Sequence, residues 1–252
     1  MFPSATTLPP KASPDMSQNT NPARNFDRVT EQLFSLLVTG ERRAARQIVD
    51  AIYDAGIAAE TVSKEIFWPL LENVTALYRQ DRITTLSYQY ASRLLRMLVD
   101  QAQARYENQG LRGKRVAMFC GQTETEELAG QMVADLLEAD GYEVSFAGGG
   151  VANDEIRAEL GEREPDILLM FASSAKDAPS IRGLIDDIRE NGAYTGMQIV
   201  VGGGIFNRAP GLAEEIGADV CASSPRDLLE KLVSESGARN ERFARRTTRR
   251  VA

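Results

Sequence analysis

The stretch RVAMFCGQTETEELAGQMVADLLEADGYEVSFAGGG, residues 115–150, decides the fold class. A short apolar run, RVAMFC, leads into a helical pattern and then into a second strand-like run, YEVSFAG. Three further runs follow in the same rhythm: DILLMFASS, MQIVVGGG and ADVCAS. The helical segments between and after these runs lie near residues 126–140, 153–162, 179–191, 209–216 and 225–235. Strands that alternate with helices at this spacing predict a doubly wound α/β domain with a parallel sheet.

The chain before this domain has a helical period instead. The first two predicted helices end at Gly40 and Gly56, which suit helix C-caps. The third has a capping signal at Thr61 and carries Pro69, where we expect a kink or a break. The fourth covers roughly residues 85–107. Four consecutive helices with short connections predict a compact bundle.

The sequence therefore divides into two domains with an extension at each end. We place the helical bundle at 27–109 and the α/β domain at 113–236, joined by the linker NQGLRG. Residues 1–26 have no hydrophobic period, and five of the ten prolines lie there, so we expect a disordered leader. The tail, 237–252, is basic and is also expected to be disordered, with six arginines in its last 14 residues.

Composition excludes several kinds of function. The chain has no histidine, which removes Ser-His-Asp catalysis, histidine-based metal sites and the usual neutral-pH proton shuttle. Its two cysteines make no disulfide framework, and no apolar stretch approaches the roughly 20 residues that span a bilayer, so a cytoplasmic protein is expected. The body is acidic, so direct nucleic-acid binding is expected at most through the arginine-rich tail.

The loops after the strands are where a doubly wound sheet binds its ligands. In the first, Thr123 and Glu126 form a capping-box pattern, and the carboxylates of Glu124, Glu126 and Glu127 would repel a phosphate there. The second and fourth loops, AGGGV and VGGGIFN, permit either close approach of a ligand or tight turns. The third, ASSAKDAPS, offers hydroxyls for a polar ligand or for a helix cap. None of these loops carries a catalytic constellation, so we expect a protein that is not an enzyme.

Four segments resemble one family. In the helical half they are TGERRAARQIVDAIYDAGI and WPLLENVTALYRQDRITTLSYQYASRLL. In the α/β half they are GQMVADLLEADGYEVSFAGGGV and IVVGGGIFN, the latter followed by AEEIGADVCA. Their order resembles the cobalamin-binding module of corrinoid proteins, a four-helix cap followed by a Rossmann-like domain, over roughly residues 30–236. The resemblance implies that cobalamin binds between the two domains.

The ligand motif of that family is broken in this chain. The motif is an acidic residue, any residue, His, two residues and Gly, and its His binds cobalt from below. With its Gly placed on Gly130, Glu127 stands at the His position and Thr125 at the acidic one. On the cap side, where light-sensing members carry Trp and Glu-His, this chain has Tyr78, Tyr88 and Gln89. Ser173 matches the hydroxyl position of the third loop, and Gly202 and Gly203 match the Gly-Gly pair beside the nucleotide tail.

These departures bear on function. A carboxylate is a poor substitute for imidazole as a cobalt ligand, which disfavours a methyl carrier. The family also includes light- or redox-responsive regulators and antirepressors, some without a DNA-binding domain, and this chain looks most like those. The resemblance thus implies a sensor that binds cobalamin, or another tetrapyrrole such as haem or a bilin, and signals to a protein partner, for example a transcription repressor. A homo-oligomer is also open.

Two alternative functions and the roles of two residues remain open at this stage. The protein could be a ligand-free interaction module, with Tyr78, Tyr88 and Tyr90 as core aromatics. It could be a corrinoid carrier for methyl transfer. Trp68 could be a core anchor or a lid over the cofactor, and Cys120 is expected to pack in the core rather than to bind a metal.

Overall fold

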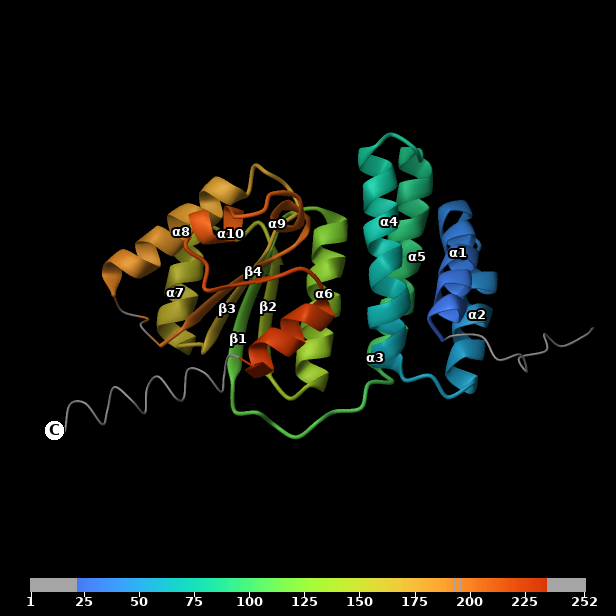
Figure 1. Ribbon diagram of the computed structural model, residues 1–252, viewed down its shortest axis with the longest axis horizontal. Helices are drawn as coiled ribbons and strands as arrows, with labels where there is room; N and C mark the ends of the chain where they lie inside the picture. Colours follow the sequence, from blue (N-terminus) through green and yellow to red (C-terminus); the bar gives the residue numbers. More distant parts are fainter. Residues whose placement is uncertain (1–21, 193, 195, 235–252) are drawn as a thin grey trace, which may run out of the picture.

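The computed structural model describes residues 22–192, 194 and 196–234. The first 21 residues of the predicted leader and the predicted basic tail lie outside the described residues. Figure 1 shows a helical domain, residues 22–103, beside an α/β domain that begins at residue 115, with the helix α6 (Glu124–Ala139) between the sheet and the helical domain. The predicted fold class, a helical bundle followed by a Rossmann-like parallel sheet, is confirmed.

The helical domain contains four long helical segments. Their elements are α1 (Pro22–Thr39), α2 (Arg42–Asp54), α3 (Ala59–Val62), the π-helix η1 (Ser63–Phe67), α4 (Trp68–Arg79) and α5 (Thr85–Gln103). Gly40 and Gly56 follow α1 and α2 with positive φ of 75° and 82°, as their sequence positions predict. The helix α1 begins at Pro22 and includes the last five residues of the predicted leader, since proline is tolerated in the first turn of a helix.

The third predicted helix is continuous but changes its winding at Pro69. The elements α3, η1 and α4 follow one another without a gap, and Pro69 is the second residue of α4. Proline removes an N–H and its ring clashes with the carbonyl four residues earlier, and the wider π-turn just before Pro69 accommodates both effects. The predicted capping role of Thr61 is wrong, because the helix begins after Ala58, which makes no side-chain cap.

The α/β domain is built on five parallel strands in the order β2-β1-β3-β4-β5. The strands are β1 (Arg115–Cys120), β2 (Glu143–Gly149), β3 (Ile167–Phe171), β4 (Gln198–Gly202) and β5 (Val220–Ala222). The chain order reverses between β1 and β3, so the topological switch point lies between these two neighbouring strands.

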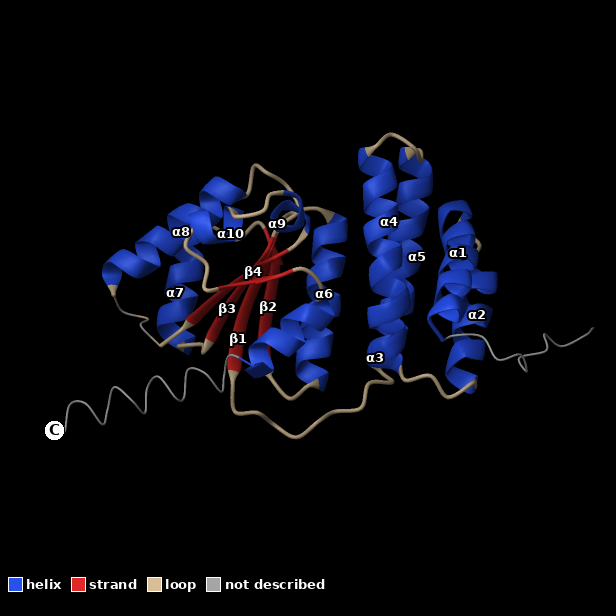
Figure 2. Cartoon of the chain, viewed as in Figure 1, coloured by secondary structure: helices blue, strands red, loops and turns tan. Residues whose placement is uncertain are grey.

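Helices cover both faces of this sheet (Figure 2). They are α6 (Glu124–Ala139), α7 (Asn153–Arg163), α8 (Ala178–Asn191), α9 (Gly204–Arg208), α10 (Leu212–Glu215) and a last helix over 225–234. The helix predicted near 209–216 is present as α10 but is shorter, and α9 before it was not predicted. Pro210 and Gly211, the latter with φ of 86°, separate α9 from α10. A residue before proline is disfavoured in the helical region, so α9 ends there.

Two apolar clusters hold the sheet. Residues of α7 to α10 pack on one face in one cluster. On the other face, α6 and the last helix pack in a cluster that continues into the core of the helical domain. Twelve of the 16 residues of α6 are buried, because this helix packs against the sheet on one side and against α4 and α5 on the other. No helix that the structure describes has both the length and the apolar character that crossing a bilayer requires.

Candidate functional site

The junction between β1 and α6 contains almost no loop. Thr123 caps the helix: its hydroxyl accepts a hydrogen bond from the Glu126 N–H at 3.3 Å, and the Glu126 carboxylate accepts one from the Thr123 N–H at 3.2 Å. The predicted capping box is therefore confirmed. Since α6 starts at Glu124, only Gly121, Gln122 and Thr123 separate it from the end of β1.

Glu126 is the main finding at this junction. Its side chain is buried, with only 3% of the residue exposed, and its Oε1 accepts a hydrogen bond of 2.6 Å from the backbone N–H of Ser173, directly beyond β3. Glycine at position 121 provides the space for the Glu126 carboxylate, because a Cβ there would collide with it. The protein's own carboxylate thus bridges the ends of β1 and β3 at the switch point, where ligands of doubly wound sheets bind. The sequence signalled the capping box but not this second contact.

The structure separates the two candidate residues of the broken ligand motif. Thr125 is buried and faces the helical domain, where its hydroxyl lies 3.0 Å from the Tyr88 hydroxyl. Glu127 faces the other way and lies beside Gly148. Glu127 is also close to Cys120 at the end of β1: burial raises the pKa of the Cys120 thiol to about 12, and the charges of Glu127 and Glu126 add to this effect. Because Glu127 lies beside β2 and Cys120, it does not point to the space between the domains.

Tyr78 and Tyr88 form one unit on the helical side. Their rings stack with centroids 4.0 Å apart and planes 15° from parallel, and the Tyr88 hydroxyl reaches Thr125 on α6. Burial raises the pKa of Tyr88, so its hydroxyl stays protonated at neutral pH. Gln89 is half-buried on the same helix, but it is not among the residues that line the pocket described next. Tyr90 is 45% exposed and is not a core aromatic.

A pocket of about 210 Å³ lies between the two domains. From α4 it is lined by one face of the helix, including Trp68, and from the α/β domain by the ends of β3 and β4 and by α6 and α9. Its α/β lining is Thr125, Ala129, Phe171, Ser173, Gly203, Gly204, Asn207 and Arg208. The structure thus brings the candidates Thr125, Ser173 and Gly203 together at one pocket, and Trp68 joins them.

Trp68 is both a core anchor and a pocket wall. It is 7% exposed and meets the Phe171 ring edge to face at a centroid distance of 6.0 Å, so it connects the domains. Its Nε1 is buried and makes no well-formed hydrogen bond. The Glu72 carboxylate lies nearby: burial raises the pKa of Glu72, and the indole N–H of Trp68 partly offsets this rise.

The paired glycines have different roles. Gly202 ends β4 beside Phe171 and does not line the pocket. Gly203 lines the pocket and has φ of 102°, and a Cβ there would collide with the carbonyl oxygen of Ala172. Close packing of the third and fourth loops therefore explains the glycine at position 203 even if no ligand binds there.

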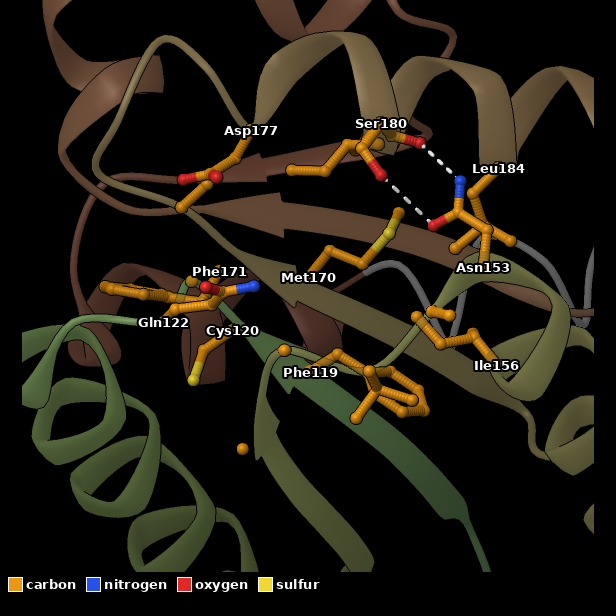
Figure 3. Close-up of a pocket in the computed structure, with 17 residues that line it drawn as sticks. Phe119, Cys120, Gln122, Asn153, Ile156, Met170, Phe171, Asp177, Ser180 and Leu184 are labelled. Atoms are coloured by element: carbon orange, nitrogen blue, oxygen red, sulfur yellow. Dashed lines mark hydrogen bonds between the residues drawn. The ribbon is translucent and has the colours of Figure 1, made fainter.

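A second cavity, of about 250 Å³, opens at the strand ends near α7 and α8 (Figure 3). Gln122 and Asp177 lie on one side of it, and Asn153 and Ser180 exchange hydrogen bonds on the other. Burial, followed by the charge of Glu126, raises the pKa of Asp177. This cavity belongs to the α/β domain alone, whereas the interdomain pocket is shared.

Comparison with protein families gives two matches, both to a B12 binding domain. One model matches residues 114–233, and a second matches residues 29–103. Together they cover both domains. A search of curated protein sequences gives no match.

Three solved structures are similar to this chain, and the first of them shares its fold. A monomethylamine corrinoid protein from Methanosarcina barkeri matches with a TM-score of 0.64 and 15% identity, over 82% of this chain and 98% of that one. A cobalamin-binding protein from Desulfitobacterium hafniense DCB-2 matches with a TM-score of 0.44 and 16% identity, over 81% and 97% of the two chains. The methanol:cobalamin methyltransferase complex MtaBC from Methanosarcina barkeri matches with a TM-score of 0.42 and 16% identity, over 87% and 83%.

Proposed function

Because the chain belongs to the family of B12-binding domains, with cobalamin as its cofactor, we propose that it is a non-enzymatic regulatory protein. It binds cobalamin between the helical and α/β domains and signals the state of the cofactor to a protein partner. The partner that we propose is a regulatory protein, for example a transcription repressor.

The interdomain pocket fits a corrinoid in its chemistry. Both matched domains line it, Trp68 and Phe171 give it an apolar wall, and the indole N–H of Trp68 is a buried donor without a well-formed hydrogen bond. When bound, cobalamin supplies a cobalt centre whose upper ligand and oxidation state respond to light or to reductants. Trp68 and Gly203, which line the pocket, would contact the corrin, and Trp68 would exclude water from this side.

The residues at the junction do not suit a mode of binding in which a protein side chain replaces the cofactor's own base. No histidine is present to replace the cofactor's own base, the Glu126 carboxylate is occupied by the Ser173 and Thr123 N–H groups, and Glu127 points away. The residues therefore fit a corrinoid that keeps its own axial base. This observation carries the proposal, because the side chain at the ligand position is a carboxylate, which is a poor substitute for the imidazole of the family's motif.

Cofactor binding has to move the domains. The pocket is smaller than the roughly 300–1,000 Å³ of ordinary ligand pockets, and a corrin is larger than most ligands of such pockets. Room for it requires α4 and α5 to shift relative to α6, which breaks the Tyr88–Thr125 hydrogen bond and the bonds from Arg96 to the Glu124 carbonyl and to Gln131. This displacement is a signal that a partner could read.

Reconstitution in the dark tests the proposal. The purified protein is incubated with hydroxocobalamin, adenosylcobalamin, haem or biliverdin and then separated from free ligand by gel filtration. We expect the absorbance of a cobalamin to co-elute with the protein, together with increased protease sensitivity at the interdomain linker. Retention of none of these tetrapyrroles would instead favour a ligand-free interaction protein, in which the stacked Tyr78 and Tyr88 serve only to join the domains.

A corrinoid carrier for methyl transfer is the second candidate. The observation that favours it is the shared two-domain architecture over 98% of the monomethylamine corrinoid protein. Incubation of the reduced, cobalamin-loaded protein with a methyl donor and a corrinoid methyltransferase distinguishes the two. A methylcobalamin spectrum that forms at a rate comparable with that of a histidine-ligated carrier would replace the regulatory proposal.

A further inference from the structure

Two arginines face the interdomain pocket from opposite domains. Arg79 is the last residue of α4, and Arg208 is the last residue of α9; both line the pocket. Partial burial lowers the pKa of Arg208, and the positive charge of Arg79 lowers it further, so the two guanidinium groups repel one another. Glu72 is the only acidic residue in the lining, which leaves this part of the pocket with a net positive charge.

The Arg208 side chain is held in place by its surroundings. Its Nη2 donates a 2.6 Å hydrogen bond to the Ser173 carbonyl oxygen. The guanidinium folds back over Gly204, where any Cβ would collide with Nη1. A planar guanidinium fixed through one nitrogen still presents its other N–H groups, and that geometry suits paired oxygens of a carboxylate or phosphate.

A third donor lies in the same pocket wall. The Nε1 of Trp68 is buried and has no well-formed hydrogen bond, whereas buried indole N–H groups usually have a partner. Among the residues that the structure describes, no ion pair neutralises Arg79. The lining therefore has a net positive charge: Arg79 and Arg208 are both solvent-exposed, and Glu72, the one acidic residue of the lining, also lies beside the Trp68 N–H.

We propose that Arg79 and Arg208 form an oxyanion clamp that binds a phosphate group across the two domains. Two sources have this chemistry: a free phosphate-bearing effector, and the phosphodiester in the nucleotide loop of cobalamin. The second source rests on the proposed function. In either case the anion links the end of α4 to α9 and replaces repulsion between the two guanidinium groups with attraction to a shared ligand.

Titration of the full chain with inorganic phosphate tests the first source. Trp68 is the only tryptophan, so its fluorescence reports on this pocket, and calorimetry measures binding independently. We expect saturable binding that Arg79→Gln weakens at least fivefold. Arg82→Gln is the matched control, since Arg82 is exposed as Arg79 is but does not line the pocket, and this variant should bind as the wild type does.

Comparison of cyanocobalamin with dicyanocobinamide, which lacks the nucleotide loop and its phosphodiester, tests the second source. We expect Arg79→Gln to weaken cyanocobalamin binding at least fivefold and to leave dicyanocobinamide binding unchanged. If Arg79→Gln weakens the binding of inorganic phosphate or of cyanocobalamin, the result supports the clamp and shows which of the two supplies the phosphate group. If neither free phosphate nor cyanocobalamin binding depends on Arg79, the clamp is overturned, whereas cobalamin retention by the wild type decides the proposed function separately.

Discussion

Replacement of Asp135 by Asn should stabilise the protein at neutral and higher pH. Asp135 lies on the side of α6 that faces α5, is 6% exposed, and has a buried Oδ2 without a hydrogen bond. Burial raises the pKa of its carboxyl to about 7, and the negative charges of Glu138 and Asp100 add to this effect. The folded protein therefore holds a proton at Asp135 that the unfolded chain releases near the ordinary pKa of 3.8.

The sign and size of the effect follow from this shift. The folded state binds the proton more tightly, so its stability falls as pH rises from about 4 to about 7 and then stays low. At about 1.4 kcal/mol per pKa unit, the buried carboxyl lowers the stability by up to roughly 4 kcal/mol at pH 8, where it is ionised in both states. At pH 5 it lowers the stability by roughly 1–2 kcal/mol, because the folded protein keeps a proton that the unfolded chain has released. Asp135→Asn is neutral at every pH, so its advantage over the wild type should grow by roughly 2–3 kcal/mol between these two values.

Urea denaturation at pH 5 and pH 8, followed by circular dichroism, measures this change. Asp81→Asn is the matched control, since Asp81 is exposed and has a positive φ that asparagine also tolerates. Its effect should be the same at both pH values. If the stability difference between Asp135→Asn and the wild type does not change with pH, the carboxyl is already solvated, and the close packing of α5 on α6 described above is incorrect.

Three further predictions concern the junction and the domain contact. Glu126→Ala should cost about 1–3 kcal/mol of unfolding free energy, because it leaves the N–H groups of Ser173 and Thr123 without their acceptor. Glu124→Ala at the same helix start should cost less than about 1 kcal/mol in the same denaturation assay. Gly203→Ala should cost at least about 1 kcal/mol through its positive φ and the Ala172 carbonyl, measured as a lowered Tm. If the domains must separate for binding, Arg96→Met removes about 1 kcal/mol of contact and should tighten cobalamin binding about fivefold in equilibrium dialysis. Arg93→Met, on the exposed side of the same helix, should leave the affinity unchanged, and equal affinities for both variants would contradict domain separation.

Periodicity predicted most of the architecture because both domains follow simple hydrophobic patterns. The runs at β1 and β3 are apolar enough to be recognised as buried strands, and Gly40 and Gly56 mark helix ends through their need for positive φ. The details at proline were missed. A π-turn before Pro69 keeps one helix continuous, whereas Pro210 and Gly211 separate α9 from α10.

The site was predictable in its place but not in its contacts. The loops after β3 and β4 contribute Ser173 and Gly203 to the pocket, as the topology of a doubly wound sheet predicts. Alignment of the broken motif could not show which way each side chain of α6 points. Glu127, placed at the histidine position, faces β2, while Glu126 takes the buried position between β1 and β3. One residue of helix rotates a side chain by about 100°, so a shift of one in the alignment exchanges these roles.

Electron paramagnetic resonance of cob(II)alamin bound to isotopically nitrogen-labelled protein tests the central claim, that this chain binds cobalamin between its domains without an axial ligand of its own. We predict that the cofactor is retained and that the nitrogen splitting of the cobalt signal is that of the cofactor's own unlabelled base. A splitting that changes with the label would show a protein nitrogen on cobalt, and failure to retain the cofactor would show no site at all; either result would contradict the account.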